Sequence, residues 1–238
     1  MSLSPSVVGE FFGTLVLILL GDGVVAGVLL ARSKAHNSGW IVITAGWAFA
    51  VVCGIFVSKA LGGPGAINPV GPLTDMASNR ITPAEGLPLI LAEFAGAFTG
   101  AILVWLHYLP HWKETSDAGA KLAVFCTGPA IRAPLANLVS EVIGTFLLVF
   151  AASAVGKAAT GGMEPALVGL VVWAIGLSLG GTTGYAINPA RDLGPRLAHA
   201  ILPIAGKGTS DWGYAWVPVM GPCLGALLGA FLFSSLAR

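Results

Sequence analysis

The chain has 238 residues, of which 55% are hydrophobic and only 10% are charged, and its formal net charge is +1. Because soluble domains carry roughly a quarter charged residues, this composition predicts a membrane protein. The near-neutral charge indicates no nucleic-acid partner. The three cysteines are scattered along the chain, so we predict neither a disulfide framework nor a metal site.

Six stretches are long and apolar enough to cross a bilayer, which takes about 20 residues. They are expected at 7–30, 40–60, 86–106, 135–155 and 214–236, and the fifth in chain order has its core at 165–179. The first stretch lacks a basic segment before it and is too long for a cleavable signal, so we expect it to be retained. Residues 108–134 are the most polar region and are predicted to form one long loop.

Two Asn-Pro segments interrupt this pattern, GPGAINPVGPLTD around Asn68 and GGTTGYAINPARDLGPR around Asn188. Asparagine is a good N-cap and proline a good first helical residue, so each segment predicts a glycine-rich break followed by a short helix. The first short helix should run to about residue 79. The second should last only about two turns, because Gly194 and Pro195 follow.

The two halves of the chain match each other. Residues 10–14 (EFFGT) pair with 141–145 (EVIGT), 66–69 (AINP) with 186–189, and Gly96-Ala97 with Gly221-Pro222. Each half holds three spans, an odd number, so the halves must insert with opposite orientation. We therefore predict an all-helical membrane protein with one channel domain, 1–238. It consists of a first inverted repeat at 1–107, a connecting loop at 108–134 and a second repeat at 135–238. Its two short helices should meet near the bilayer midplane. Basic residues give no positive-inside bias, so charge alone does not set the orientation.

These features resemble the aquaporin superfamily, or major intrinsic proteins. The residues that resemble its aquaglyceroporin, or glycerol uptake facilitator, branch are Asp192 directly after Asn-Pro-Ala-Arg, Arg196, Trp105 and Pro218-Val219. The resemblance covers nearly the whole chain. It implies six transmembrane helices, two re-entrant half-helices, one pore per subunit, a homotetramer in the plasma membrane, and cytoplasmic N- and C-termini.

The first motif departs from the family's Asn-Pro-Ala. Val70 stands where the family has alanine, and its extra methyl groups are expected to loosen or shift the contact between the two short helices. Ala66 stands where many members have histidine. Glu93 stands where we expect glutamine, and it is a candidate third structural carboxylate beside Glu10 and Glu141.

The midplane of the pore is predicted from the two motifs, Asn68-Pro69-Val70 and Asn188-Pro189-Ala190. Each asparagine oxygen can cap its own short helix, which fixes the amide donors toward the lumen. Non-helical backbone at membrane depth is tolerated where it lines a wet cavity or is buried in protein. We therefore expect lining carbonyls from Gly65, Ala66, Ile67, Gly184, Ala186 and Ile187, opposite an apolar wall.

Four positions resemble the family's outer constriction: Trp47, Gly176, Tyr185 and Arg191. Arg191 would supply fixed donors for hydroxyl groups, and the two aromatic residues an apolar corner. Gly176 would leave room where water-selective members have histidine, and Tyr185 would make the passage slightly narrower or more polar.

Carboxylates inside the spans need partners. We expect Glu10 and Glu141 to brace the backbone N–H groups of the non-helical segments. Asp192 and Arg196 lie four residues apart on one short helix and are expected to pair.

The sequence thus predicts a passive channel for glycerol and other small uncharged solutes, water included, that excludes ions and protons in a lipid bilayer. Dihydroxyacetone or undissociated lactic acid are alternative cargoes that the sequence does not separate from glycerol. A proton- or sodium-coupled carrier is the alternative of a different class, which the short chain and the lack of paired ionisable residues disfavour. No catalytic constellation and no cofactor site is evident, so we do not expect an enzyme.

Overall fold

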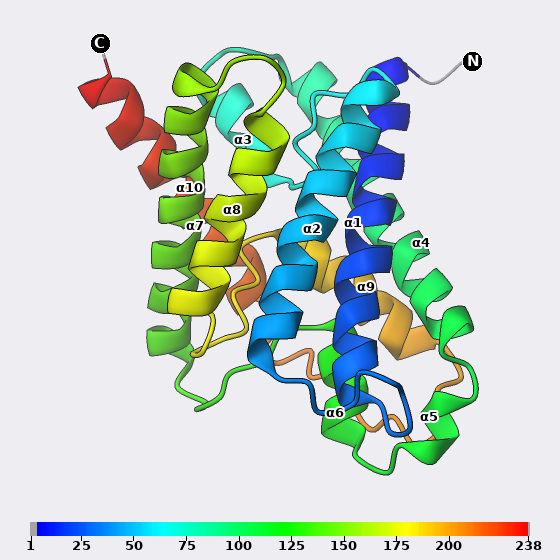
Figure 1. Ribbon diagram of the computed structural model, residues 1–238. Coiled ribbons are helices and arrows are strands. Elements are labelled where there is room, and N and C mark those ends of the chain that lie inside the picture. The colour runs from blue at the N-terminus through cyan, green and yellow to red at the C-terminus, as the bar shows by residue number, and fades with distance from the viewer. Residues whose placement is uncertain (1–3, 238) are drawn as a thin grey trace.

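The computed structural model describes residues 4–237, and all regular structure in that range is helical (Figure 1). The helices are α1 (Pro5–Leu29), α2 (Trp40–Ala60), α3 (Val70–Ala77), α4 (Pro83–His107), α5 (His111–Glu114), α6 (Ala118–Phe125), α7 (Pro134–Ala158), α8 (Glu164–Ser178), α9 (Pro189–Ile201) and α10 (Val217–Leu236). Of these, α1, α2, α4, α7 and α10 have the length and composition to cross a membrane, and α8 is a shorter apolar helix of 15 residues. All six predicted spans are therefore helical.

Helix starts follow local chemistry. Proline lies in the first turn of α1, α4, α7, α8 and α10, where its missing N–H has no intrahelical partner to lose. The Ser4 hydroxyl accepts from the backbone of Val7, and Thr82 forms a capping box with Glu85. The spans thus begin where the sequence satisfies their exposed N–H groups.

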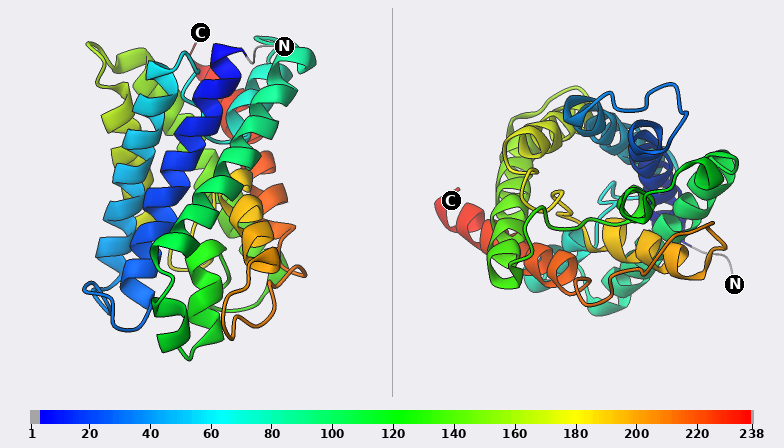
Figure 2. Two further views of the ribbon diagram at one scale, coloured as in Figure 1. Left: turned by 90° about the vertical axis from the view of Figure 1, so that its right-hand side faces the viewer. Right: turned by 90° about the horizontal axis from the view of Figure 1, so that it is seen from below.

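The packing interlocks the two halves. Helix α1 packs against α2 and α4, while α7 packs against α8 and α10, and α2 meets α8 across the halves. The short helix α3 packs against α10, and α9 packs against α4, so each short helix lies on the last helix of the other half. Seen along the bundle, the long helices form a ring, and the irregular segments before α3 and α9 run inside it (Figure 2). Helices α3 and α9 lie toward opposite ends of the molecule (Figure 1).

Close helix contacts at glycines of α4 and α10 show that one predicted pair of equivalent positions in the repeat is wrong. A Cβ on Gly96 would lie 2.2 Å from the Phe11 carbonyl oxygen, and a Cβ on Gly225 would lie 2.3 Å from the Val142 carbonyl oxygen. Phe11 and Val142 are equivalent in the matched segments 10–14 and 141–145. Gly96-Ala97 is therefore equivalent to Gly225-Ala226, one turn later than the Gly221-Pro222 that we predicted. At both places glycine lets the backbones approach closely.

The second short helix is longer than predicted. Gly194 and Pro195 lie inside α9, which runs for 13 residues. A Cβ on Gly194 would lie 2.8 Å from Cβ of Ala97 and 3.0 Å from the Phe98 nitrogen, so glycine is required where α9 crosses α4. The packing and ion pairs of α9 offset the lost proline hydrogen bond, which costs roughly 3 kcal/mol in an isolated helix. Tertiary contacts therefore override the local stop signal.

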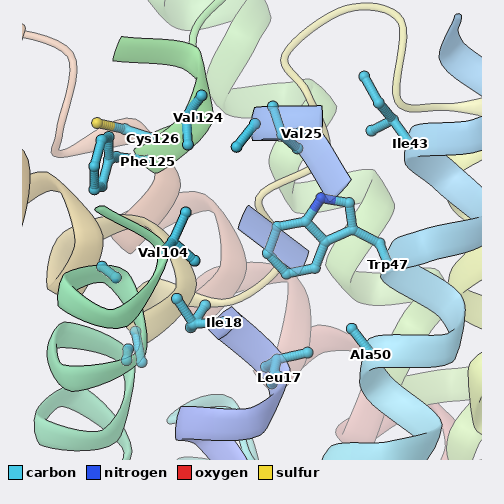
Figure 3. Close-up of a cluster of buried hydrophobic side chains, with 14 of the residues drawn as sticks. Leu17, Ile18, Val25, Ile43, Trp47, Ala50, Val104, Val124, Phe125 and Cys126 are labelled. Atoms are coloured by element: carbon cyan, nitrogen blue, oxygen red, sulfur yellow. The ribbon is translucent and has the colours of Figure 1, made fainter. Parts of the chain in front are cut away.

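The connecting loop is also more ordered than predicted, because it holds α5 and α6. Trp112 and Phe125 from this region stack with ring centroids 5.5 Å apart, and both side chains are buried. Figure 3 shows Phe125 and Cys126 in the same hydrophobic cluster as Ile18, Val104 and Trp47. The loop is thus part of the core at one end of the bundle.

Candidate functional site

A carboxylate holds the irregular segment before each short helix. Glu10 of α1 accepts hydrogen bonds from the backbone N–H groups of Gly65, Ala66 and Ile67 at 2.9, 3.1 and 2.6 Å, and from the Ser58 hydroxyl at 2.6 Å. The N–H groups of this segment would otherwise be buried without an acceptor. Glu10 therefore braces the backbone, as the sequence predicted.

Glu141 of α7 does the same in the second half. Its oxygens accept from the N–H groups of Ala186 and Ile187 at 3.0 and 2.9 Å and from the Thr183 hydroxyl at 2.6 Å. Ile187 has a φ of 43° and Ile67 a φ of 44°, a left-handed conformation that is strained for a β-branched side chain. The two carboxylates hold these isoleucines in place.

The tips of the two short helices are joined by a reciprocal pair of hydrogen bonds. The Asn68 amide donates to the Ile187 carbonyl and the Asn188 amide to the Ile67 carbonyl, both at 2.9 Å. The loosening expected from Val70 is not seen, because Val70 is buried and both bonds are intact. Each amide has two hydrogens, so one remains for a solute.

The asparagine oxygens cap their own helices, but unequally. The Asn188 oxygen accepts from the N–H groups of Ala190 and Arg191 at 3.0 and 3.1 Å. The Asn68 oxygen accepts from Val70 alone, at 3.2 Å. Both amides are thus held by their own helix on one side and by the opposite segment on the other.

Two cavities lie along the interior. The first, of about 360 Å³, is lined by both asparagines and by all six residues from which we expected lining carbonyls. Its apolar lining includes Leu17, Val51, Ile55, Leu148 and Val172. The second, of about 370 Å³, lies against Trp40, Ala123 and Thr127. The first cavity is therefore lined by the irregular segments before both half-helices on one side and by apolar residues on the other.

The residues that line both cavities are Trp47, Gly184, Tyr185 and Arg191. Three of them belong to the predicted constriction. The fourth predicted residue, Gly176, is not among the lining residues of either cavity within the described range 4–237. A Cβ on Gly176 would lie 2.8 Å from Tyr185 Cζ, so the room that this glycine leaves is filled by the Tyr185 phenol.

Arg191 is held from several sides. Its guanidinium carbon lies 4.1 Å from the centroid of the Trp47 ring, within the range of a cation–π contact. Its Nη1 donates to the Phe125 carbonyl at 3.1 Å and lies 3.5 Å from Oδ1 of Asp22. Asp22, from the C-terminal half of α1, was missed by our sequence analysis, although a carboxylate within an apolar span is itself a signal of function.

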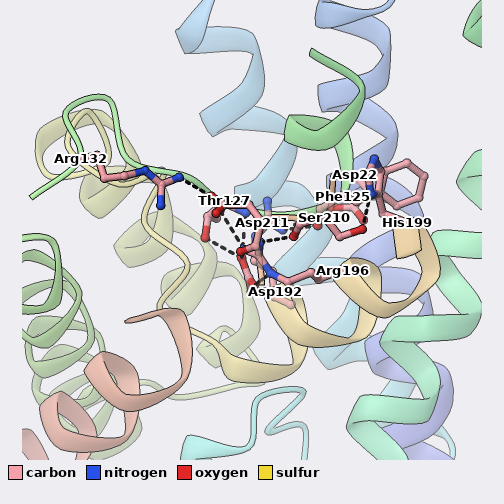
Figure 4. Close-up of polar contacts among 10 residues, drawn as sticks. Asp22, Phe125, Thr127, Arg132, Asp192, Arg196, His199, Ser210 and Asp211 are labelled. Carbon is pink, nitrogen blue, oxygen red and sulfur yellow. Dashed lines mark hydrogen bonds and ion pairs between the residues drawn. The ribbon is translucent and has the colours of Figure 1, made fainter. Parts of the chain in front are cut away.

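Asp192 and Arg196 form a buried ion pair, as predicted, with Nε to Oδ1 at 2.8 Å (Figure 4). Asp192 also accepts from the backbone and hydroxyl of Thr127. The remaining Arg196 donors reach the carbonyls of Thr127, Ser210 and Asp211, so all five guanidinium hydrogens are used. This network ties α9 to the segments around 127 and 210.

Polar residues at the same end complete the network. His199 and Ser210 are hydrogen-bonded at 2.9 Å, and Lys207 donates to the carbonyls of His199, Ala200 and Leu202 at the end of α9. Outside the spans, Arg132 pairs with Asp211, and this hydrogen bond raises the pKa of the guanidinium. These contacts fix α9, which carries Arg191.

Glu93 lies beside the first brace. Its Oε1 accepts from the Asn68 N–H at 3.1 Å, and its carboxyl faces that of Glu10. Its Oε2 is buried without a hydrogen-bond partner among the described residues. Glu93 is thus a third brace, as expected, but a partly satisfied one.

Known proteins match this chain over nearly its whole length. Residues 1–233 match the family model described as major intrinsic protein. Glycerol uptake facilitator protein 3 of Lactiplantibacillus plantarum is 56% identical over 98% of each chain, and a probable glycerol uptake facilitator protein of Thermotoga maritima is 56% identical over 94% of this chain and 96% of the relative. The X-ray structure of the aquaglyceroporin from Plasmodium falciparum has a TM-score of 0.85 and 27% identity, with 98% of this chain and 96% of that chain covered. The six spans, the two facing half-helices and these matches together establish that the chain belongs to the major intrinsic protein family.

Proposed function

We propose that this channel protein passes glycerol and other small uncharged solutes, including water, down their gradients and excludes ions and protons. The proposal rests on the observation that Trp47, Tyr185 and Arg191 line both cavities and so lie between them. A guanidinium supplies hydrogen-bond donors there, while the aromatic rings supply apolar surface. Glycerol presents hydroxyl groups on one edge and carbon on the other, which matches that division. The relatives named as glycerol uptake facilitators support the same cargo.

Exclusion of cations has a separate basis. The N-termini of α3 and α9 both face the first cavity through Asn68 and Asn188. Each helix start carries a partial positive charge, so the two together oppose a cation at the midplane. The single free hydrogen on each asparagine amide can still bind a passing hydroxyl oxygen.

We further propose that the protein works as a homotetramer in the plasma membrane, with one pore per subunit and with both termini in the cytoplasm. Helix α1 starts, and helix α10 ends, on the same side of the bundle, so both termini can face one compartment (Figure 1). Cross-linking in native membranes tests the tetramer. Labelling of a cysteine placed in the segment 31–39 tests the orientation, because that segment would face outward.

Light scattering from reconstituted vesicles tests the cargo. Vesicles are exposed to gradients of glycerol, dihydroxyacetone, urea, and lactic acid at low pH. We expect glycerol to enter much faster than in protein-free vesicles. Faster entry of dihydroxyacetone or lactic acid than of glycerol would favour those cargoes instead, and glycerol flux no faster than in protein-free vesicles would refute the proposal.

A further inference from the structure

Asp22 is a buried carboxylate that lines neither cavity and braces neither half-helix. It lies in the C-terminal half of α1, its side chain is 0% exposed, and neither oxygen accepts a hydrogen bond from the described residues. A buried carboxylate is costly unless an opposite charge compensates it. The group that does so here is Arg191, whose Nη1 lies 3.5 Å from Oδ1.

The other contacts of Arg191 show which of its donors remain free. Nη1 is shared between Asp22 and the Phe125 carbonyl, and the Trp47 ring covers one face of the guanidinium. Nε and Nη2 have no protein acceptor within residues 4–237. Arg191 lines both cavities, whereas Asp22 lines neither, so Asp22 contacts Arg191 from behind the pore.

The charges nearby leave Asp22 as the counter-ion of Arg191. Asp192 lies close, but Arg196 and Thr127 occupy its oxygens, and that ion pair is neutral as a unit. If Asp22 is removed, the charge of Arg191 is uncompensated at the point where the cavities meet. The adjacent residue of α1 shapes the same place, because a Cβ on Gly21 would lie 2.2 Å from the Trp47 ring.

We propose that Asp22 is a positioning and specificity-determining residue of the constriction. Its carboxylate cancels the charge of Arg191 from the side of Nη1, which the Phe125 carbonyl holds, so that Nε and Nη2 face the solute. The constriction then offers hydrogen-bond donors but carries no net charge. It therefore excludes anions as well as cations. Without this partner, the positive half-helix ends and Arg191 would together attract anions, as basic residues do in anion pores. The inference rests on the proposed function, whose constriction it explains.

A cycle of charge variants tests the inference in reconstituted vesicles. The net charge of the pair is zero in the wild type, positive in Asp22→Asn, negative in Arg191→Gln, and zero again in the double variant. Chloride, potassium and glycerol fluxes are measured on each preparation. We expect chloride flux to rise about tenfold or more in Asp22→Asn, which corresponds to about 1.4 kcal/mol. Potassium flux should rise in Arg191→Gln alone, and both leaks should fall in the double variant.

Asp117→Asn is the matched control, because this carboxylate is exposed and caps α6 at one end of the bundle. It should leave all three fluxes unchanged. Wild-type chloride flux in Asp22→Asn, or a chloride leak that persists in the double variant, would overturn the inference. If Asp22→Asn does not incorporate, Asp22→Ser replaces it. If neither variant incorporates, Arg191→Gln decides the question. This variant leaves the charge of Asp22 uncompensated, so an unchanged potassium flux would overturn the inference.

Failure of this inference differs from failure of the proposed function. Vesicles of the wild type that do not conduct glycerol would refute the proposed function. Vesicles that conduct glycerol but show no dependence of ion flux on the charge of the pair would refute the role of Asp22 alone.

Discussion

The two half-helices share a frame but differ in charge. Both begin at an Asn-Pro motif, both are braced by a glutamate, and each asparagine amide binds the opposite segment at 2.9 Å. When Asn68 is aligned with Asn188, the second half-helix carries Arg191, Asp192 and Arg196 where the first carries Gly71, Pro72 and Met76. Tyr185 likewise stands opposite Gly65. The frame therefore follows the repeat, while the chemistry of the constriction is confined to one half.

The first half has its own asymmetry. With Gly96 aligned to Gly225, Glu93 is equivalent to Pro222. The first half-helix is thus flanked by two buried carboxylates, and the second by Glu141 alone on that side. The N–H of Asn68 needs the extra acceptor that Glu93 supplies at 3.1 Å.

The largest effect on stability is expected from Arg196→Met, which gives the second half-helix the residue that the first has at the equivalent position, Met76. This change leaves Asp192 buried without its ion pair and should lower the free energy of unfolding by about 3–5 kcal/mol. Thermal unfolding in detergent, followed by circular dichroism, measures the loss. The control is Arg80→Met, because Arg80 pairs with Asp75 at the surface and its loss should cost less than about 1 kcal/mol. Equal losses for the two variants would contradict the structural role of the buried pair.

An intermediate effect is expected from Gly176→His. The new Cβ would meet Tyr185 Cζ at 2.8 Å and Thr44 Cγ2 at 3.0 Å, so the phenol must move toward the solute path. Glycerol flux should fall by about tenfold or more, the equivalent of about 1.4 kcal/mol, and water flux by less. Stopped-flow light scattering measures both.

Gly156→His is the matched control for that variant, because Gly156 lies on α7 with no atom near its Cβ position. It should leave both fluxes as in the wild type. Equal losses of glycerol and water flux in Gly176→His would mean that position 176 does not act through the constriction.

The smallest effect is expected from Glu93→Gln. The amide oxygen still accepts from Asn68, and a second carboxyl beside Glu10 is removed. Glu93 has no cation partner among the described residues, and a second carboxyl beside Glu10 is unfavourable, so the free energy of unfolding should stay equal or rise by about 1 kcal/mol. Unfolding in detergent measures it, with Glu10→Gln as the comparison, since Glu10 accepts four bonds. A loss in Glu93→Gln as large as in Glu10→Gln would show that the two carboxylates brace the segment equally.

The sequence predicts the frame well because its signals are local. Hydropathy predicts the spans, and the Asn-Pro motifs predict where the half-helices start. The matched glutamates predict which side chains hold the irregular segments. Asp192 and Arg196 could be paired from their spacing alone. Those predictions depend only on residues within one segment, or on a repeat between two.

The remaining features depend on contacts between distant segments. Gly194 and Pro195 stop a helix in isolation, but α4 packs against α9 at that place and the helix continues. Gly176 was expected to widen the pore, yet Tyr185 fills its space. The order of residues 111–125 depends on aromatic packing that no local pattern specifies.

We propose that solute passes by unassisted diffusion through one narrow passage that runs beside the joined tips of the half-helices and past Trp47, Tyr185 and Arg191. The most direct measurement is the initial rate of glycerol entry into reconstituted vesicles over a wide range of glycerol gradients, with and without a protonophore. We expect a rate that rises in proportion to the gradient and is unchanged by the protonophore. A rate that saturates at low glycerol, or that collapses when the proton gradient is removed, would contradict it and indicate a coupled carrier.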